Sequence, residues 1–519
     1  MRITNNVIMR NTKTNINTNK LNVNDMNNQM SSQKKIALPS DDPVIAVRAL
    51  RLRSNLGELD QYLHTNIEQA DSWLDITETA IGNISSLLNK IYDCCVQGAN
   101  DTLNQQDRNA ILAQLKQNRD QIHSEGNTDY AGRTVFTGYK TNAPLTYTDA
   151  SNDHYQIDQR LSFEDLQENK YIYNEVIAGD ISGFASLPNT AYATGNDPGC
   201  QTVNRIRLAY DSLTYDPLDT TSQPKIFEVD ADGKVTTTPI SFTVVTTQQL
   251  EEKGYDVKEL DGTNGIVLNR ETGELLFTDE KANEFKASMT KFQITYDKTG
   301  FSKGDLTPED YFNCRKFDDT KTPPEVDKTY KHIDDKGAWI NENINYTVAI
   351  NQEFAINIEA KDVLNHNIGR DITDLGNTVQ AAIDAYDKVA KIEGMLKLDA
   401  YAGEEDQAKL KALLERANKE ATYADDQMRN LFTKYVGRFQ DYINTAELAR
   451  TDVGARGDRL MMTKNRVEAQ FNTVDKLKSQ NEDADLSDVV IDYQASYLAY
   501  QASLQAASKV QQQTLLDYI

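Results

Sequence analysis

The stretch that decides the fold of this chain is 486-LSDVVIDYQASYLAYQASLQAASKVQQQTLLDYI-519. Apolar and aromatic side chains recur in it at alternating steps of four and three residues, which keeps them on one stripe of a helix that packs against another helix. The members of this stripe are Leu486, Val490, Tyr493, Tyr497, Tyr500, Leu504 and Ala507. Because such a stripe is unstable in water, the stretch predicts a helix that needs a partner.

A matching stripe lies far upstream and takes the same steps. Its members are Trp73, Thr77, Ala80, Ile84, Leu87, Ile91 and Cys94. We expect four of these, Trp73, Ile84, Leu87 and Ile91, to form the core of a helical bundle. We therefore predict that the two ends of the chain pair, and that everything between them is an insertion.

The distribution of proline supports this division. Nine of the 11 prolines lie between Pro144 and Pro324, whereas residues 44–143 and 325–519 contain none. Proline disrupts helix interiors and is common in turns, so long helices should flank a turn-rich middle. The expected fold is α+β: a discontinuous bundle of N- and C-terminal helices that extends into a coiled coil, with a β-rich domain inserted in the middle. The expected segments are an assembly-dependent helix at 1–40, a bundle part at 41–143, a β-rich insertion at 144–365, a second bundle part at 366–482 and a coiled-coil helix at 483–519.

Short runs of β-branched and aromatic residues fill the middle, separated by Gly, Asp, Asn and Pro. Such runs are typical of antiparallel strands and turns. The expected strands are 240–245, 265–268, 274–277 and 292–296, and a hairpin of 346–350 with 354–358 is expected just before the helices resume.

Composition excludes several classes of protein. The formal charge of -24 disfavours binding to nucleic acid or to anionic lipid. A mean hydropathy of -0.62 is typical of a soluble protein, and we expect no transmembrane segment. Residues 1–28 contain no continuous apolar core, so no cleavable signal peptide is expected. The four cysteines, Cys94, Cys95, Cys200 and Cys314, include no CxxC pair and suggest neither a disulfide framework nor a metal site.

Catalytic motifs are absent from the sequence, so no catalytic residue, cofactor or metal is expected. His64 and His123 lie in expected helices, where a solvated side chain is the usual explanation. The run 230-DADG-233 resembles the start of a calcium loop but lacks the later ligands, which favours a solvated turn. Small residues at 454-GARG-457 suggest either an anion site or close helix approach, and we favour the packing role.

The first thirty residues contain ten asparagines, which compete with helices for backbone hydrogen bonds. A seven-residue repeat nevertheless joins Met9, Ile16, Val23 and Met30. We expect a segment that is disordered alone and folds on a partner. The alternative is a frayed terminus with accidental spacing.

The first firm helix start is 40-SDDP-43, where an acidic cap precedes proline at the first helical position. An apolar face should follow, formed by Val44, Val47, Leu50, Leu52, Leu56, Leu59 and Leu63.

Both ends of the chain carry an ordered set of short motifs. The N-terminal motifs are 38-LPSDDPVIAVRAL-50, 66-NIEQADSWL-74, Asn127 with Thr128, and 132-GRTVFTGY-139. The C-terminal motifs are 453-VGAR-456, 483-DADL-486, Tyr497 with 501-QASL-504, and 515-LLDYI-519. The set covers about residues 1–140 and 430–519, and in this order it resembles the family of flagellar hook-associated protein 3 far more specifically than any one motif does. The middle resembles no family.

Flagellin shares the plan of paired ends and is the nearest competitor. Flagellins typically carry a Ser-Ser-Gly-Leu-Arg-Ile run before their acidic pair, where this chain has 31-SSQKKI-36, and many end in arginine rather than in LLDYI. These differences favour the junction family over the filament protein.

The resemblance implies a structural adaptor layer between the flagellar hook and filament, assembled by coiled-coil packing of the two ends. It implies hook-associated protein 1, flagellin, further copies of the chain and a flagellar export chaperone as partners, and export through the type III channel to an extracellular site. The expected assembly interface consists of Ile16, Val23, Met30, Leu486, Val490, Tyr493, Tyr497, Tyr500, Leu504 and Leu515. The alternatives are a filament subunit, or a secreted or cell-surface binding protein that displays the central domain.

Overall fold

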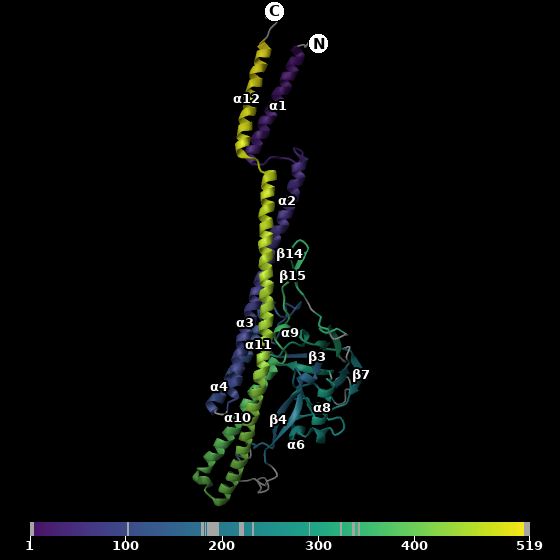
Figure 1. Cartoon of the computed structure of the whole chain (residues 1–519), viewed down its shortest axis with the longest axis vertical. Coiled ribbons are helices and arrows are strands. Elements are labelled where there is room, and N and C mark those ends of the chain that lie inside the picture. The colour runs from purple at the N-terminus through teal and green to yellow at the C-terminus, as the bar shows by residue number, and fades with distance from the viewer. Residues whose placement is uncertain are drawn as a thin grey trace, which may run out of the picture. The chain divides into compact units, whose positions relative to one another are not determined.

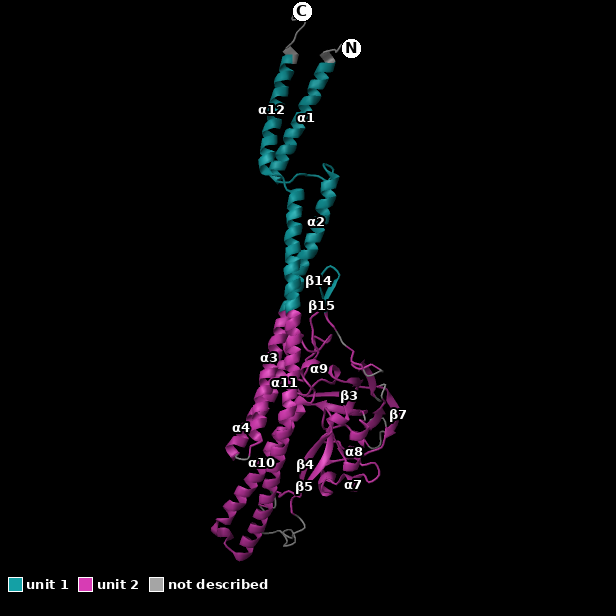
Figure 2. Cartoon of the chain, viewed as in Figure 1, with its two compact units in different colours: residues 1–71, 345–354, 458–519 teal, residues 72–344, 355–457 magenta. Residues whose placement is uncertain are grey.

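A computed structural model describes residues 5–512 except for 101–102, 178–180, 182, 184–196, 217–222, 231–232, 290, 322–323, 335–337 and 341–342. The chain forms two compact units (Figure 2). Unit 1 comprises residues 1–71, 345–354 and 458–519, and unit 2 comprises residues 72–344 and 355–457. This division groups the chain differently from the five expected segments, which therefore remain a proposal.

Unit 1 is built from helices that come from both ends of the chain. They are α1 (Asn5–Ser32), α2 (Pro43–Gln61), the π-helical turn η1 (Tyr62–Ile67), the beginning of α3 (Glu68–Gly98), the end of α11 (Glu404–Glu482) and α12 (Leu486–Gln512). Helices α1 and α12 lie side by side and run in opposite directions (Figure 1). A two-stranded sheet of β14 (Asn345–Ala349) and β15 (Gln352–Ala355) contacts η1, which confirms the expected hairpin with its second strand beginning two residues early.

The start of α2 follows the predicted chemistry. The Asp42 carboxylate accepts hydrogen bonds from the backbone amides of Val44 and Ile45, and Pro43 stands at the first helical position. The predicted apolar face is partly wrong, because Val44, Val47 and Leu50 are exposed. The residues that are buried along α2 and η1 are Ala46, Ala49, Leu59, Leu63 and Ile67.

The helices of unit 2 are most of α3, then α4 (Gln105–Gly126), α9 (Ala360–Val363), α10 (Ile368–Leu396) and the first part of α11. Helix α3 packs closely on α11: a side-chain carbon added at Gly98 would fall 2.1 Å from the ring of Phe432. Ser85 on α3 also donates a hydrogen bond to Glu447 on α11. The expected partner of the α3 stripe was therefore wrong. Helix α3 packs against α11, whereas α12 pairs with α1. Both helix pairs use the same spacing, so spacing alone could not distinguish the partners.

The insertion consists of two sheets, as expected for a β-rich middle. The six-stranded sheet has the order β13-β12-β3-β11-β6-β7, with β3 Ser151–Ser162, β6 Lys225–Val229, β7 Val235–Ile240, β11 Lys291–Phe301, β12 Asn313–Asp318 and β13 Glu325–Tyr330. The five-stranded sheet has the order β4-β5-β10-β9-β8, with β4 Gln167–Tyr173, β5 Gly199–Arg207, β8 Thr243–Val245, β9 Ile266–Asn269 and β10 Glu274–Phe277. The pairing of β8 with β9 is parallel, which departs from the antiparallel expectation.

Short elements complete the described chain. They are β1 (Asp129–Tyr130) paired with β2 (Arg133–Thr134), and the helices α6 (Thr247–Glu252), α7 (Val257–Leu260) and α8 (Asp279–Ser288). Within the described ranges, no helix is both long enough and apolar enough to cross a bilayer.

Candidate assembly interface

Helices α1 and α12 meet along a regular stripe. Half-buried residues recur along α1 at alternating steps of four and three, namely Thr12, Ile16, Asn19, Val23, Met26 and Met30, and Gln29 is half-buried beside them. Opposite them, α12 presents Val489, Tyr493, Ser496, Tyr500, Ser503 and Ala507 at the same steps. The amide of Asn19 also donates a 3.3 Å hydrogen bond to the backbone oxygen of Ala499. The pair is thus a short antiparallel coiled coil with several polar positions in its seam.

The expected interface residues divide between two faces of this pair. Ile16, Val23 and Met30 lie on the α1 side of the seam, and Tyr493 and Tyr500 lie on the α12 side. Val490 is half-buried at the edge of the α12 stripe. Leu515 lies outside the described residues.

The remaining expected residues of α12 do not face α1. Leu486, Tyr497 and Leu504 are 46%, 43% and 42% exposed. Ile491 and Leu498 are more exposed still. Helix α12 therefore carries more apolar positions than one neighbouring helix covers, and its remaining apolar surface, formed by Leu486, Ile491, Tyr497, Leu498 and Leu504, is called here the outer face. Sequence reasoning placed Tyr493 and Tyr500 correctly but missed Ser496 and Ser503 of the seam, because these two are small and polar.

A cluster of hydrogen bonds ties the chain together where α1 ends and α12 begins. Backbone bonds join the Lys35 amide to the Glu482 carbonyl (2.8 Å) and the Ala484 amide to the Gln33 carbonyl (3.0 Å). The guanidinium of Arg53 on α2 binds both carboxylate oxygens of Glu482, which is buried. This bidentate arrangement fixes geometry as well as charge.

Charge reinforces this tie. A hydrogen bond from Lys34, supported by one from Ser479, lowers the pKa of the Asp483 carboxyl. The hydrogen bond and charge of Glu482 raise the pKa of Arg53. Ionised groups thus hold the chain where α1 ends and where α12 begins.

In unit 2, all four residues that we expected in the bundle core are buried: Trp73, Ile84, Leu87 and Ile91. A second feature of this unit was not anticipated. Arg205 and Arg207 on β5 reach the carboxylates of Asp371 and Asp374 on α10, which joins the five-stranded sheet to the helices.

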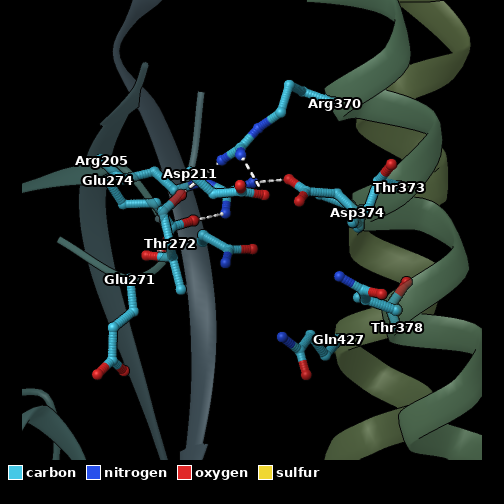
Figure 3. Close-up of a pocket in the computed structure, with 13 residues that line it drawn as sticks. Arg205, Asp211, Glu271, Thr272, Glu274, Arg370, Thr373, Asp374, Thr378 and Gln427 are labelled. Carbon is cyan, nitrogen blue, oxygen red and sulfur yellow. Dashed lines mark hydrogen bonds and ion pairs between the residues drawn. The ribbon is translucent and has the colours of Figure 1, made fainter. Parts of the chain in front are cut away.

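Further groups complete this buried ionic cluster. Arg205 also pairs with Glu274 on β10 (Figure 3). On α11, the Tyr442 hydroxyl donates to Asp371 (2.7 Å) and the Arg438 Nε lies 3.1 Å from it. Burial alone would raise the pKa of Asp374, but Arg207 and Arg205 together hold that pKa well below its usual range.

A polar cavity of about 260 Å³ lies beside the cluster (Figure 3). Its wall includes Arg370, whose guanidinium lies 2.9 Å from Asp211 and donates to the Thr272 carbonyl. On its wall Arg205 pairs with Glu274 and Asp374, while Glu271 accepts a hydrogen bond from the Thr247 amide. The sequence signal for this cluster was the run 203-VNRIRL-208, where two arginines alternate with strand residues.

Two expectations about individual side chains were wrong. His123 is half-buried rather than fully solvated, and burial, followed by the charge of Arg119, lowers its pKa to about 4. The small residues Gly454 and Gly457 do not permit close helix approach, since an added side-chain carbon at either would meet no atom within 4 Å. Arg456 instead pairs with Asp452 and donates to the Asn357 carbonyl.

The other candidate residues have ordinary structural environments in the part of the chain that the structure describes. His64 is exposed and lies 2.8 Å from Asp60. The four cysteines are free thiols, and the described residues contain no group of His, Cys, Asp and Glu side chains arranged to hold a metal. The Asp230 carboxylate accepts from the Lys234 amide within the turn between β6 and β7, while residues 231–232 of that turn lie outside the described ranges.

Comparison with known proteins gives the same division into ends and middle. Residues 3–141 match the bacterial flagellin N-terminal helical region, and residues 436–519 match the bacterial flagellin C-terminal helical region. The two ends of the chain are thus similar to the helical regions of flagellin and are called here the flagellin-type ends. They flank the β-rich insertion, which neither region includes.

Individual relatives agree with these flagellin-type ends. Flagellar hook-associated protein 3 of Salmonella typhimurium strain LT2 is 32% identical over 116 residues, which are 22% of this chain and 36% of that protein. Flagellar hook-associated protein 3 of Escherichia coli K12 is 31% identical over 114 residues, with the same coverage. The chain thus matches about a third of the length of these relatives, and the resemblance found in the sequence is confirmed.

Two further matches are broader and weaker. A flagellin of Salmonella rubislaw is 27% identical over 259 residues, which are 46% of this chain and 51% of that protein. The solved structure of a hook-associated protein from Vibrio parahaemolyticus, described as putative, covers 85% of this chain and all of its own, at 14% identity and a TM-score of 0.34. That score is too low to establish a common fold.

Proposed function

We propose that this chain is a structural component of the bacterial flagellum that forms an adaptor layer at the junction between hook and filament. The observation that carries the proposal is the outer face of α12. A helix that is already paired with α1 still exposes Leu486, Tyr497 and Leu504 on one side and Ile491 and Leu498 beyond them. Large exposed apolar side chains that recur along a helix already paired on another side indicate a surface that a partner protein covers.

The composition of α1 supports assembly that is coupled to folding. Its seam includes Thr12 and Asn19 among apolar residues, and asparagine is a weak helix former. An isolated pair with such a seam is only marginally stable, so neighbouring subunits that cover the outer face would stabilise both helices. Incorporation and ordering of the ends are then one event.

The proposed partners follow from the position of the layer. Further copies of the chain would lie beside it, with hook-associated protein 1 on the hook side and flagellin on the filament side. An export chaperone would cover the ends before secretion through the type III channel. The role requires no catalysis and no cofactor, and no contact with nucleic acid or membrane.

A filament subunit is the second candidate, because a flagellin is among the matched relatives. Immunogold labelling of intact flagella with an antibody against the insertion separates the two. Label confined to the base of the filament supports the junction role. Label along the whole filament indicates a flagellin, and label on the cell body without flagella indicates a surface binding protein.

A further inference from the structure

Two half-buried histidines line one cavity of unit 2, between bundle helices and the insertion. The cavity has a volume of about 300 Å³ and is bordered by α4, by the beginning of α10 and by the connection after β11. His123 and His366 both form part of its wall. For neither ring does the described structure contain a hydrogen-bond partner.

His123 is pressed against the connection formed by residues 302–306. A side-chain carbon at Gly304 would fall 2.5 Å from its Nδ1, and Gly304 has a φ of +92°, which favours glycine. A side-chain carbon at Gly369 on α10 would fall 3.3 Å from its Nε2. The ring therefore lies between the backbones at Gly304 and Gly369, which leave little room for the water molecules that a protonated ring would bind.

The charged groups around His123 do not favour a proton on it. Arg119 on its own helix lowers its pKa, whereas Asp120 acts in the opposite sense and more weakly than burial. The other charged groups on the cavity wall are Asp211, Lys303, Asp305 and Arg370. Arg370 and Asp211 are already paired with each other.

His366 lies in a comparable environment just before α10. Its ring centroid is 5.2 Å from that of Phe312, at an interplanar angle of 77°, and 6.3 Å from that of Tyr311. Burial, followed by the charge of Arg207 on β5, lowers its pKa to about 4. Asp371 on α10 opposes this effect, and Arg438 on α11 adds to it.

We propose that this wall is an acid-sensitive latch, in which protonation of His123 and His366 detaches the 302–306 connection from helices α4 and α10. Each proton would place a cation between arginines in a poorly solvated site, and opening the wall relieves that repulsion by admitting water. The latch would alter the surface of the insertion when the surroundings become acidic. It is independent of the assembly role proposed for α12.

The direction of the pH effect follows from the difference in proton binding between the closed and open states. A histidine with a pKa of about 4 in the closed state and an ordinary pKa when open binds more protons when open. The closed state therefore weakens as pH falls from about 6.5 towards 4. At pH 5 the opening constant should rise about twentyfold for each histidine relative to pH 7.

The test combines hydrogen exchange with histidine titration on the full-length protein. In the native chain, amide exchange of residues 302–306 and 364–370, corrected for intrinsic rates, should show this increase in opening between neutral pH and pH 5. The double variant His123→Gln with His366→Gln should abolish it. The matched control His64→Gln changes an exposed histidine of unit 1 and should leave it intact.

Nuclear magnetic resonance titration of the native protein gives a second reading that needs no variant. The resonances of His123 and His366 should titrate near pH 4. Titration of both rings near pH 6.5 would overturn the proposal, as would an undiminished increase in exchange in the double variant.

Discussion

At the scale of single residues, the most consequential contact is the one between Arg207 and Asp371. Asp371 is completely buried, so its charge is tolerated only because Arg207, Arg438 and Tyr442 surround it. Buried ion pairs add little net stability over apolar packing, but removal of one partner leaves an uncompensated charge. The cluster therefore specifies how the sheet is attached to the helices more than it stabilises the fold.

Arg207→Ala should destabilise unit 2 by about 3 kcal/mol, at the lower end for a broken buried pair because Arg438 remains. The measurement is urea unfolding followed by the fluorescence of Trp73, which is buried in that unit. Lys258→Ala removes one partner of a highly exposed pair with Glu280 and is the control. Equal losses of unfolding free energy in the two variants would show that removing a partner from the buried cluster costs no more than removing one at the surface.

His154 should respond to pH in the opposite sense to His123. Its pKa is raised, first by Asp297 and also by Asp319, while burial acts against them. The protonated ring thus contributes stability that is fully present below about pH 6.5 and is lost as pH rises through the folded value. His154→Gln should lower the unfolding midpoint at pH 5.5 and have a smaller effect at pH 9. An effect that grows with pH would contradict this assignment.

At the scale of elements, the outer face of α12 is the decisive surface. Tyr497→Asp with Leu504→Asp adds two charges where the free protein is already exposed, so the monomer should keep its folded state. Burial of those charges against a neighbouring subunit is strongly unfavourable, so incorporation should fail. The measurement is electron microscopy of flagella, together with circular dichroism of the purified variant.

Two contrasts sharpen this experiment. Ala499→Asp with Ala506→Asp introduces the same charges seven residues apart at exposed positions off both the seam and the outer face, and should be tolerated. Tyr493→Asp with Tyr500→Asp changes the seam with α1 and should disorder both helices within the monomer. Normal filaments from the Tyr497 and Leu504 variant would mean that α12 is not a surface between subunits.

Sequence patterns predicted elements better than their partners. The spacing of apolar residues predicted the helices, and the run 40-SDDP-43 predicted the capped start of α2. Runs of β-branched residues predicted β9, β10 and β11. The spacing led to the wrong partner for α3, because an apolar stripe indicates which face of a helix is buried but not which element covers that face. The cluster around Asp371 depends on residues that are far apart in the chain, so a local pattern could not reveal it.

At the scale of the whole molecule, the flagellin-type ends and the insertion should be separable in function. Replacement of residues 152–327 by a short flexible linker removes Arg205 and Arg207, but it also uncovers Asp371 and Asp374 to water, where their charges are solvated. The helices should therefore tolerate the removal better than the single change Arg207→Ala. Secretion and motility should be largely retained. Loss of all filaments, with the shortened protein still stable and secreted, would show that the insertion itself takes part in the junction.

The central claim is that this chain joins hook to filament, and deletion of its gene tests the claim most directly. Electron microscopy of the deletion strain should show hooks without filaments, with unpolymerised flagellin in the medium, and the intact gene supplied in trans should restore filaments. Filaments of normal number and length on the deletion strain would contradict the account.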